Sequence, residues 1–197
     1  LWQKSQKAPK IHHVAQGETL YAIAFRYDRD YHELAKDNHL SSPYVLRVGQ
    51  AIKLYATKPK LIPTIDVPPV LNITGSSSWT WPINGAIKTG YNPSAGHKGI
   101  NIKGVNGQKV KAAAKGIVAY AGDGLPGYGN LIIIKHDKQF LTAYGNNKRI
   151  LVREGQYISQ GQVIADVGIV DRKFWGLHFE IRKYGEPVNP LYYLKKT

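Results

Sequence analysis

A proline-rich segment in the middle of the chain divides it into two parts. Residues 56–78 read ATKPKLIPTIDVPPVLNITGSSS, with prolines at positions 59, 63, 68 and 69. Proline removes a backbone donor and clashes with the preceding helical turn, so no helix continues through this spacing. The Gly-Ser end is typical of a flexible tether. We therefore predict a semi-extended linker, 56–78, between two domains, 11–55 and 79–197.

The first domain shows the order strand, helix, helix, strand. A short strand is expected at residues 13–15, followed by a helix in QGETLYAIAFRY that begins near Glu18 or Thr19. Apolar residues at helical spacing after a capping side chain support this helix. A second short helix is expected at residues 31–38, and a returning strand in VGQAIKLY. The predicted fold is a small α+β module of the type β-α-α-β.

Three motifs of this module, V-x-x-G-E-T-L-x-x-I-A, L-x-x-x-N-x-L and V-G-Q-x-I-K-L, resemble the LysM family. The resemblance implies binding to the N-acetylglucosamine-containing glycan of peptidoglycan or chitin through two loops. The implied glycan-binding residues are Gly17, Glu18, Thr19, Leu20, Asn38, Leu40, Pro43 and Tyr44. In a structural interpretation, Leu20 and Leu40 only close a small core, which leaves Tyr44 as the strongest candidate for a glycan contact.

The second domain is rich in short apolar segments that end at glycines. Examples are GIVAYAG, NLIIIKH, FLTAYG, GQVIADVG and LHFEIRKYG. Such segments, joined by tight turns, are typical of many short β-strands. The sequence therefore predicts a mainly antiparallel β domain, as a sandwich or a partly open barrel.

Several motifs of this domain resemble the LytM or lysostaphin-like zinc peptidases that cut peptidoglycan cross-links. They are H-x-G-I-x-I, G-I-V-x-Y-A-G, G-Y-G-N, V-x-x-G-Q-x-I, G-Q-x-I-A and L-H-F-E-I, in this order along the chain. Active members of that family hold zinc with the histidine and aspartate of an H-x-x-x-D pattern and the second histidine of an H-x-H pair. Two further histidines orient water and stabilise the transition state.

Only two of these five positions are retained here. His97 and His178 match the ligand histidines, whereas Asn101 stands at the aspartate, and Asn146 and Gly176 stand at the other two histidines. A catalytic zinc has three protein ligands and a bound water, and a neutral amide supplies no ligand charge. The lost histidines also remove acid–base help worth about 10²–10⁴-fold. The resemblance therefore predicts a vestigial zinc site, no zinc cofactor and no hydrolysis, with the remaining histidines bonded to Asn101 or Tyr144.

The combination of a LysM module, a linker and a degenerate LytM domain resembles the NlpD-type murein hydrolase activators of Gram-negative bacteria. The resemblance implies a periplasmic, outer-membrane-anchored protein that binds peptidoglycan and activates a zinc-dependent N-acetylmuramoyl-L-alanine amidase during cell separation. Its groove would grip an inhibitory segment of the amidase. The groove residues that we predict, besides the vestigial positions, are Lys98, Tyr128, Asn130, Tyr144 and Trp175. Trp175 belongs to a predicted loop, 168–176, where it could instead fill the space of the missing histidines.

Charge and composition favour an anionic partner. Lys and Arg outnumber Asp and Glu by 27 to 13, and residues 79–197 contribute 17 basic against 7 acidic side chains. Such an excess attracts anionic surfaces, including the free carboxylates of peptidoglycan. Nucleic acid is not expected, because the basic residues are dispersed and no helix-turn-helix pattern is present. The absence of Cys excludes disulfides and thiolate metal sites.

The chain starts at Leu1 and contains no Met, so we expect a processed or trimmed product whose original N-terminus is missing. The removal of a signal peptide or of a lipidated cysteine is compatible with this expectation. Two other functions stay open at this point. An active zinc endopeptidase would need a carboxylate from elsewhere, and Asp123, Asp171 and Glu180 are the nearby acids. A purely structural wall-binding protein would use the LysM module alone.

Overall fold

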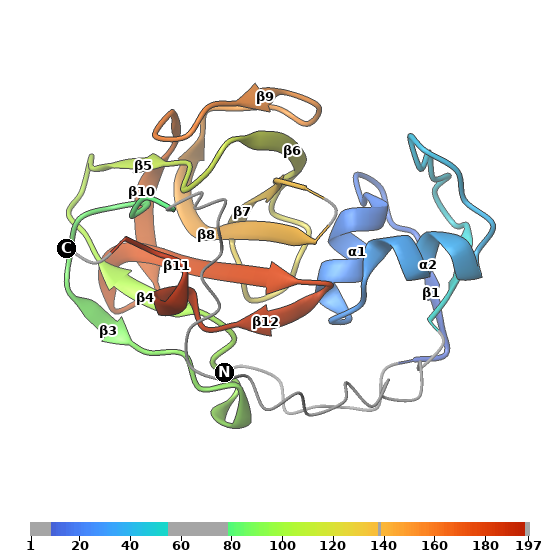
Figure 1. Cartoon of the computed structure of the whole chain (residues 1–197), viewed down its shortest axis with the longest axis horizontal. Helices are drawn as coiled ribbons and strands as arrows, with labels where there is room; N and C mark the ends of the chain where they lie inside the picture. Colours follow the sequence, from blue (N-terminus) through green and yellow to red (C-terminus); the bar gives the residue numbers. More distant parts are fainter. Residues whose placement is uncertain (1–8, 55–78, 138, 196–197) are drawn as a thin grey trace.

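The computed structural model describes residues 9–54, 79–137 and 139–195. They form a small helical body and a larger β body that lie side by side (Figure 1). The predicted linker, 56–78, lies outside the described residues. None of the helices in the described ranges has the length and hydropathy that a membrane span requires.

The small body has the predicted order β-α-α-β. Strand β1 (Ile11–His13) pairs antiparallel with β2 (Ala51–Lys53), and helices α1 (Leu20–Arg26) and α2 (Tyr31–Asp37) lie between them in the chain. The side chain of Thr19 caps α1 by accepting a hydrogen bond from the backbone of Ala22, as Ser and Thr do at helix starts. The first strand begins two residues earlier than predicted, because Ile11 pairs with Lys53.

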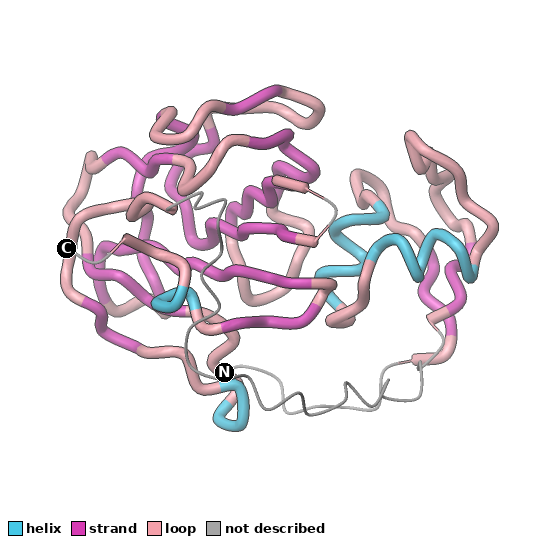
Figure 2. Tube along the Cα trace, in the orientation of Figure 1, coloured by secondary structure: helices cyan, strands magenta, loops and turns pink. Residues whose placement is uncertain are grey.

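The larger body is one antiparallel sheet of ten strands (Figure 2). Its main path has the order β3-β4-β11-β10-β8-β7-β6-β9, while β12 pairs with β11 and β5 with β10. The strands are β3 (Ile87–Thr89), β4 (Ile100–Lys103), β5 (Lys109–Lys111), β6 (Gly116–Gly122), β7 (Asn130–Lys135), β8 (Phe140–Ile150), β9 (Tyr157–Ile158), β10 (Val163–Val170), β11 (Phe174–Lys183) and β12 (Glu186–Val188); two short 3-10 helices are η1 (Pro93–Ala95) and η2 (Pro190–Tyr192). The mainly antiparallel prediction is confirmed, but the strands do not divide into the two separate sheets of a sandwich.

Strand β11 positions the candidate site. It pairs with β4 on one side and with β8 on the other, so that His178 lies opposite both Asn101 and Gly145. Successive side chains of a strand point to opposite faces. Leu177, Phe179 and Ile181 therefore enter the hydrophobic core of the sheet. The alternate residues of the same strand, His178, Glu180 and Arg182, share the other face.

The segment 168–176, predicted as a loop, is a β-hairpin. Strand β10 ends at Val170 and β11 begins at Phe174, and these two residues pair with each other. Asp171 and Arg172 have positive φ angles of 51° and 57°, which allows the tight turn between the strands. The hairpin fixes the backbone of Trp175 opposite Ile169, with the indole partly buried against the core.

Candidate functional site

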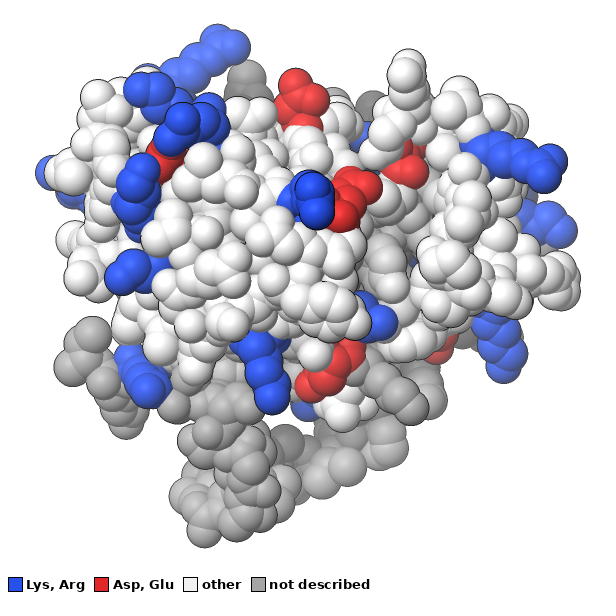
Figure 3. Space-filling model, turned by 90° about the horizontal axis from the view of Figure 1, so that it is seen from above, with Lys and Arg blue, Asp and Glu red and all other residues white. Residues whose placement is uncertain are grey.

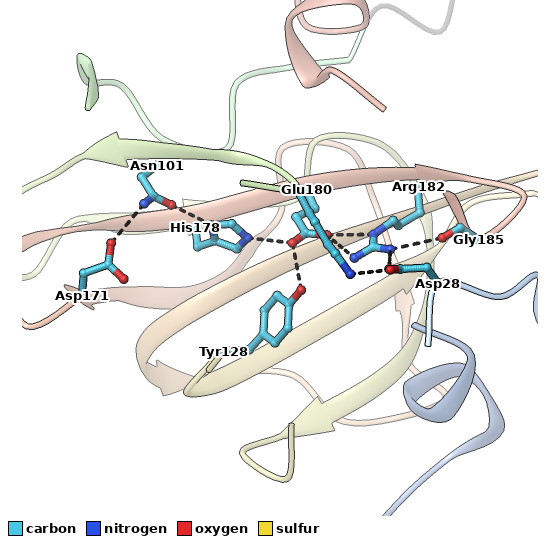
Figure 4. Close-up of polar contacts among 9 residues, drawn as sticks. Asp28, Asn101, Tyr128, Asp171, His178, Glu180, Arg182 and Gly185 are labelled. Carbon is cyan, nitrogen blue, oxygen red and sulfur yellow. Dashed lines mark hydrogen bonds and ion pairs between the residues drawn. The ribbon is translucent and has the colours of Figure 1, made fainter. Parts of the chain in front are cut away.

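Two of the five positions predicted as a vestigial zinc site, Asn101 and His178, meet in a row of polar side chains across the face of β11 (Figure 4). Nδ1 of His178 lies 2.6 Å from Oδ1 of Asn101, and Nε2 lies 2.8 Å from Oε1 of Glu180. At the other end of Asn101, its Nδ2 donates to the carboxylate of Asp171 over 3.4 Å. Asn101 and His178 are each 2% exposed. Both ring nitrogens of His178 therefore face protein oxygens inside a closed environment.

The row continues past Glu180 to Arg182, which contacts the small body. Nε of Arg182 donates to Oε2 of Glu180 over 2.7 Å, and both side chains are fully buried. Arg182 also donates to the backbone oxygen of Gly185 and to the carboxylate of Asp28, the second residue after α1. Lys98 donates to the other oxygen of Asp28. We call Asp171, Asn101, His178, Glu180 and Arg182 the polar row.

The charges of the polar row stabilise one protonation state. Burial alone would raise the pKa of Glu180, but the charge of Arg182 and the hydrogen bond with His178 outweigh it and lower the pKa to about 2. Burial, followed by the nearby charge of Glu180, raises the pKa of Tyr128 well above its ordinary value. Tyr128 thus remains a neutral donor, and its hydroxyl donates to Glu180 over 3.0 Å. An ionised carboxylate with so low a pKa is a poor general base near neutral pH.

These residues do not fit a catalytic zinc. The site offers two imidazoles and one amide, whereas such a zinc requires three protein ligands and an open position. Of the imidazoles, His178 has both nitrogens beside the oxygens of Asn101 and Glu180. His97 lies in the turn before β4, where its backbone bonds to Asn92. Among the residues that the structure describes, no three His, Cys, Asp or Glu side chains are grouped to hold a metal ion.

Gly176 and Asn146 occupy positions with specific backbone demands. A Cβ at Gly176 would overlap the carbonyl oxygen of Ile102 and lie 2.8 Å from the ring of Phe174. No side chain fits there without displacing β4. Asn146 has a positive φ of 59°, and its backbone N–H donates to the carbonyl of Tyr128. Asparagine tolerates this left-handed conformation better than most residues do.

The structure separates the predicted groove residues. Tyr128 contacts both the polar row, through Glu180, and the small body, through Phe25. Lys98 contacts Asp28 of the small body. Tyr144 is 0% exposed and packs in the sheet core, where its hydroxyl accepts hydrogen bonds from the backbone of Ala113 and the hydroxyl of Thr142. The prediction that Tyr144 lines the groove is therefore wrong, because it points to the opposite face from His178. Asn130 donates to the backbone of Asn147 and ties β7 to β8.

Sequence reasoning assigned no role to Arg182, Asp28 or Phe25. A signal existed for Arg182, because HFEIR places three polar residues at alternate positions of an apolar strand, which predicts a polar face. A weaker signal existed in α1, where the apolar residues Ala22 and Phe25 lie outside the stripe of Leu20, Ile23 and Ala24 that faces the module core. Both are 1% exposed. Apolar residues around a whole helix indicate burial on more than one side. No local pattern distinguishes Asp28.

The predicted glycan-binding loops line a cleft of about 470 Å³ between the two bodies. One wall contains Glu18, Thr19, Leu20, Pro43 and Tyr44, and the other contains residues of β6 together with Lys135 and Glu154. The hydroxyl of Thr19 donates to the carbonyl of Ala119 over 3.2 Å, which joins the walls. Gly17, Asn38 and Leu40 are not among the lining residues. The amide of Asn38 instead bonds to backbone atoms of Leu34 and Lys53.

The basic side chains are dispersed over the surface. Figure 3 shows Lys and Arg mainly toward the outer sides of the two bodies, whereas most of the Asp and Glu groups lie between them, over the middle of this face. Part of this charge is already paired, since Lys109 and Arg149 both contact Asp166. The distribution is that of a basic surface without a single continuous stripe.

Comparisons with known proteins agree with this architecture. The LysM domain family matches residues 12–54, and peptidase family M23 matches residues 95–190. The lipoprotein NlpD/LppB homolog of Pseudomonas aeruginosa is 39% identical over 226 residues, covering 93% of this chain and 76% of that protein. The murein hydrolase activator NlpD of Salmonella typhimurium is 34% identical over 252 residues, covering 92% and 67%. A zinc-containing peptidase from Vibrio cholerae superposes with a TM-score of 0.53 and 27% identity, over 62% of this chain and 41% of its own.

Proposed function

Because this chain belongs to the NlpD/LppB family of lipoproteins and carries a LysM domain and an M23 domain, we propose that it is a non-catalytic murein hydrolase activator. It binds peptidoglycan in the periplasm, anchored to the outer membrane through a lipidated N-terminus. Its target is a zinc-dependent N-acetylmuramoyl-L-alanine amidase that acts during cell separation.

The observation that carries this proposal is the set of hydrogen-bond contacts of the His178 ring. Both of its ring nitrogens lie within 2.8 Å of the oxygens of Asn101 and Glu180. His178 and Asn101, which stand at two of the three predicted zinc-ligand positions, are thus committed to a buried hydrogen-bond network. A hydrogen-bonded buried network makes this part of the fold rigid and specific, which suits recognition of a partner. The role left to this face of the sheet is binding.

Glycan binding is assigned to the cleft between the two bodies. The cleft has an apolar and aromatic wall that includes Tyr21 and Tyr44, with the cationic Lys135 opposite. Glycan rings pack on aromatic side chains, and a lysine can pair with the carboxylates of peptidoglycan. Leu20 is 1% exposed, so its part in the site is to support the wall from the module core.

The test is dye release from purified, dye-labelled sacculi. The chain alone, a candidate amidase alone and the two together are compared, each with and without added zinc. Release only by the mixture, beyond that of the amidase alone, supports the proposal. An effect of the mixture that is no greater than the amidase alone contradicts it and favours a purely wall-binding protein.

One structural observation favours the alternative that the chain is an active endopeptidase. Two of the three candidate acids, Asp171 and Glu180, do lie beside Asn101 and His178, whereas Asp123 does not contact the polar row. Release by the chain alone that a chelator abolishes would establish this alternative. The buried position of Glu180 argues against it, since a carboxylate that is 0% exposed and paired with Arg182 is not available to a metal.

A further inference from the structure

The end of helix α1 covers the end of the polar row that faces the small body. Figure 1 places α1 against the strands of the larger body, and Figure 4 shows Asp28 at the end of the row, beside Arg182. The contact lies at the face of β11 that carries the vestigial positions. The small body is therefore docked on the surface to which the proposed function assigns the amidase.

The apolar part of this contact is a core cluster shared by the two bodies. Ala22 and Phe25 of α1 pack with Leu131, Ile133 and Leu141, among other residues of the sheet. The Phe25 ring lies edge-on to Tyr128, with 5.3 Å between centroids, and the guanidinium carbon of Arg182 lies 4.2 Å from the centre of the same ring. Aromatic and cation–π contacts of this kind are strongest where they are shielded from water.

The charged part of the contact brings Asp28 between two cations of the larger body. Without the small body, Lys98 and Arg182 would face the buried carboxylate of Glu180, which pairs with Arg182, and the exposed carboxylate of Glu186, whose charge interacts with both cations. Asp28 adds a further anion through its ion pairs with Lys98 and Arg182. Arg182 is fully buried, and a buried charge is stabilised by close partners of opposite charge. The surface therefore favours a carboxylate at this point.

The two residues of the small body that contact Tyr128 and Arg182, Phe25 and Asp28, have a fixed spacing in the sequence. Phe25 lies within α1, and Asp28 lies three residues later, just past the C-cap Tyr27, with a positive φ of 52°. Residues three apart lie on one side of a helix, and here the chain leaves the helix with the carboxylate still on that side. An aromatic ring and a carboxylate thus reach Tyr128 and Arg182 together.

We propose that Lys98, Tyr128 and Arg182 form a receptor for a helix end that presents an aromatic side chain and, three residues later, a carboxylate. Phe25 and Asp28 of this chain occupy the receptor in the docked state. A target amidase has to displace them with a segment of the same chemistry. This competition rests on the proposed function, whereas the docking does not.

The docking can be weakened by steric overlap at one glycine. Gly185 lies in the turn between β11 and β12, and a Cβ there would overlap the backbone of Arg29 in the small body. Gly185→Ala should therefore separate the bodies. Gly185 has a φ of +83°, so alanine also adds local strain. Gly107→Ala is the matched control, because its φ is +84° and no atom lies within 4 Å of the position that its methyl group would take.

A second pair of variants tests the charge. Asp28→Asn removes the anion, and asparagine tolerates the left-handed backbone. Asp37→Asn is its control, since Asp37 is 30% exposed against 32% for Asp28 and pairs with Arg29 inside the small body. Because these 197 residues contain no Cys, spin labels can be placed at Lys36→Cys on α2 and Lys111→Cys on β5. Both of these side chains are exposed.

The first readout is the distance distribution between the two labels, without any amidase. We expect one narrow distance in the otherwise unchanged chain and in both controls, and a broad distribution in Gly185→Ala and Asp28→Asn. Equally narrow distributions in all variants would overturn the role of these contacts in docking. A broad distribution in the unchanged chain would overturn the docked state itself.

The second readout is the chain concentration that gives half-maximal stimulation of the amidase on labelled sacculi. We expect Gly185→Ala to lower it by about threefold or more, because removing a competing closed state raises the binding-competent fraction. Separated bodies with an unchanged half-maximal concentration would overturn the competition and leave the proposed function intact. Absence of stimulation by every variant would overturn the proposed function, and with it the competition, while the label distances would still decide the docking.

Discussion

Nδ1 of His178 lies 2.6 Å from Oδ1 of Asn101, and the two residues are register partners on β11 and β4. An amide oxygen only accepts, so Nδ1 of His178 donates a hydrogen bond to Asn101. A nitrogen that carries this proton has no free lone pair with which to bind zinc. The other end of the Asn101 amide donates to Asp171, so asparagine satisfies both neighbours. A carboxylate at position 101 would lack that donor.

Restoring the carboxylate should not restore hydrolysis. We expect Asn101→Asp to retain more zinc than the unchanged chain after dialysis, because it adds a charged ligand. Dye release from sacculi by the variant alone should stay at background, since positions 146 and 176 still lack histidine. Zinc per chain and dye release are measured together, with Asn130→Asp as the control. Chelator-sensitive release by Asn101→Asp would contradict the interpretation of these positions.

Gly176 should tolerate no side chain. Gly176→Ala places a methyl group against the backbone of β4 and the ring of Phe174, and overpacking of this kind costs about 1–3 kcal/mol. Chemical denaturation measures the loss of stability. Gly90→Ala is the control, because no atom lies within 4 Å of its added methyl position. Equal stability of the two variants would contradict this prediction and show that β4 can shift to accommodate the methyl group.

Removal of Arg182 should be far more costly than removal of a surface arginine. Arg182→Met removes the guanidinium from buried Glu180 and leaves the carboxylate with only its contacts to His178 and Tyr128, and breaking a buried ion pair in this way costs about 3–5 kcal/mol of unfolding free energy. Arg149→Met is the matched change at a side chain that is 65% exposed, where an ion pair contributes about 0–1 kcal/mol. The measurement is the denaturation midpoint of each variant, and we expect the larger decrease for Arg182→Met. Similar losses would mean that the polar row contributes little to stability.

His136 should make the fold sensitive to mild acid. Burial lowers its pKa from the ordinary value of 6.5, and its ring nitrogens lie 2.7 Å from the carbonyl of Lys115 and the hydroxyl of Thr142. The folded state therefore binds the proton less readily than the unfolded state. Its contribution to stability is present above about pH 6.5 and is lost as the pH falls through the lowered pKa.

Melting temperatures at pH 7.5 and pH 5 give the measurement for His136. The unchanged chain should lose more stability between these values than His136→Gln, which cannot take up the proton. Other groups titrate in both proteins, so the difference between the two slopes isolates the histidine. Parallel slopes would contradict the lowered pKa.

Local patterns were sufficient to predict much of the fold. The helical stripe and the hydroxyl of Thr19 define α1, and short apolar segments between glycines define an antiparallel sheet. These features depend on neighbours within a few residues, where periodicity and capping act. The same holds for the identities at positions 101, 146 and 176, since a missing carboxylate or imidazole is visible in the sequence.

The tertiary structure alone decided which groups meet. The sequence placed Tyr144 in the groove, but the pleat of β8 directs it into the core. Gly176 is crowded only because β4 lies beside it, and Asp28 reaches Arg182 across 154 positions of sequence. Contacts of this kind have no period and no spacing rule, because they depend on how two surfaces approach each other. The sequence therefore determined the elements and the missing ligands, and the packing of the two bodies determined how the remaining charges are paired.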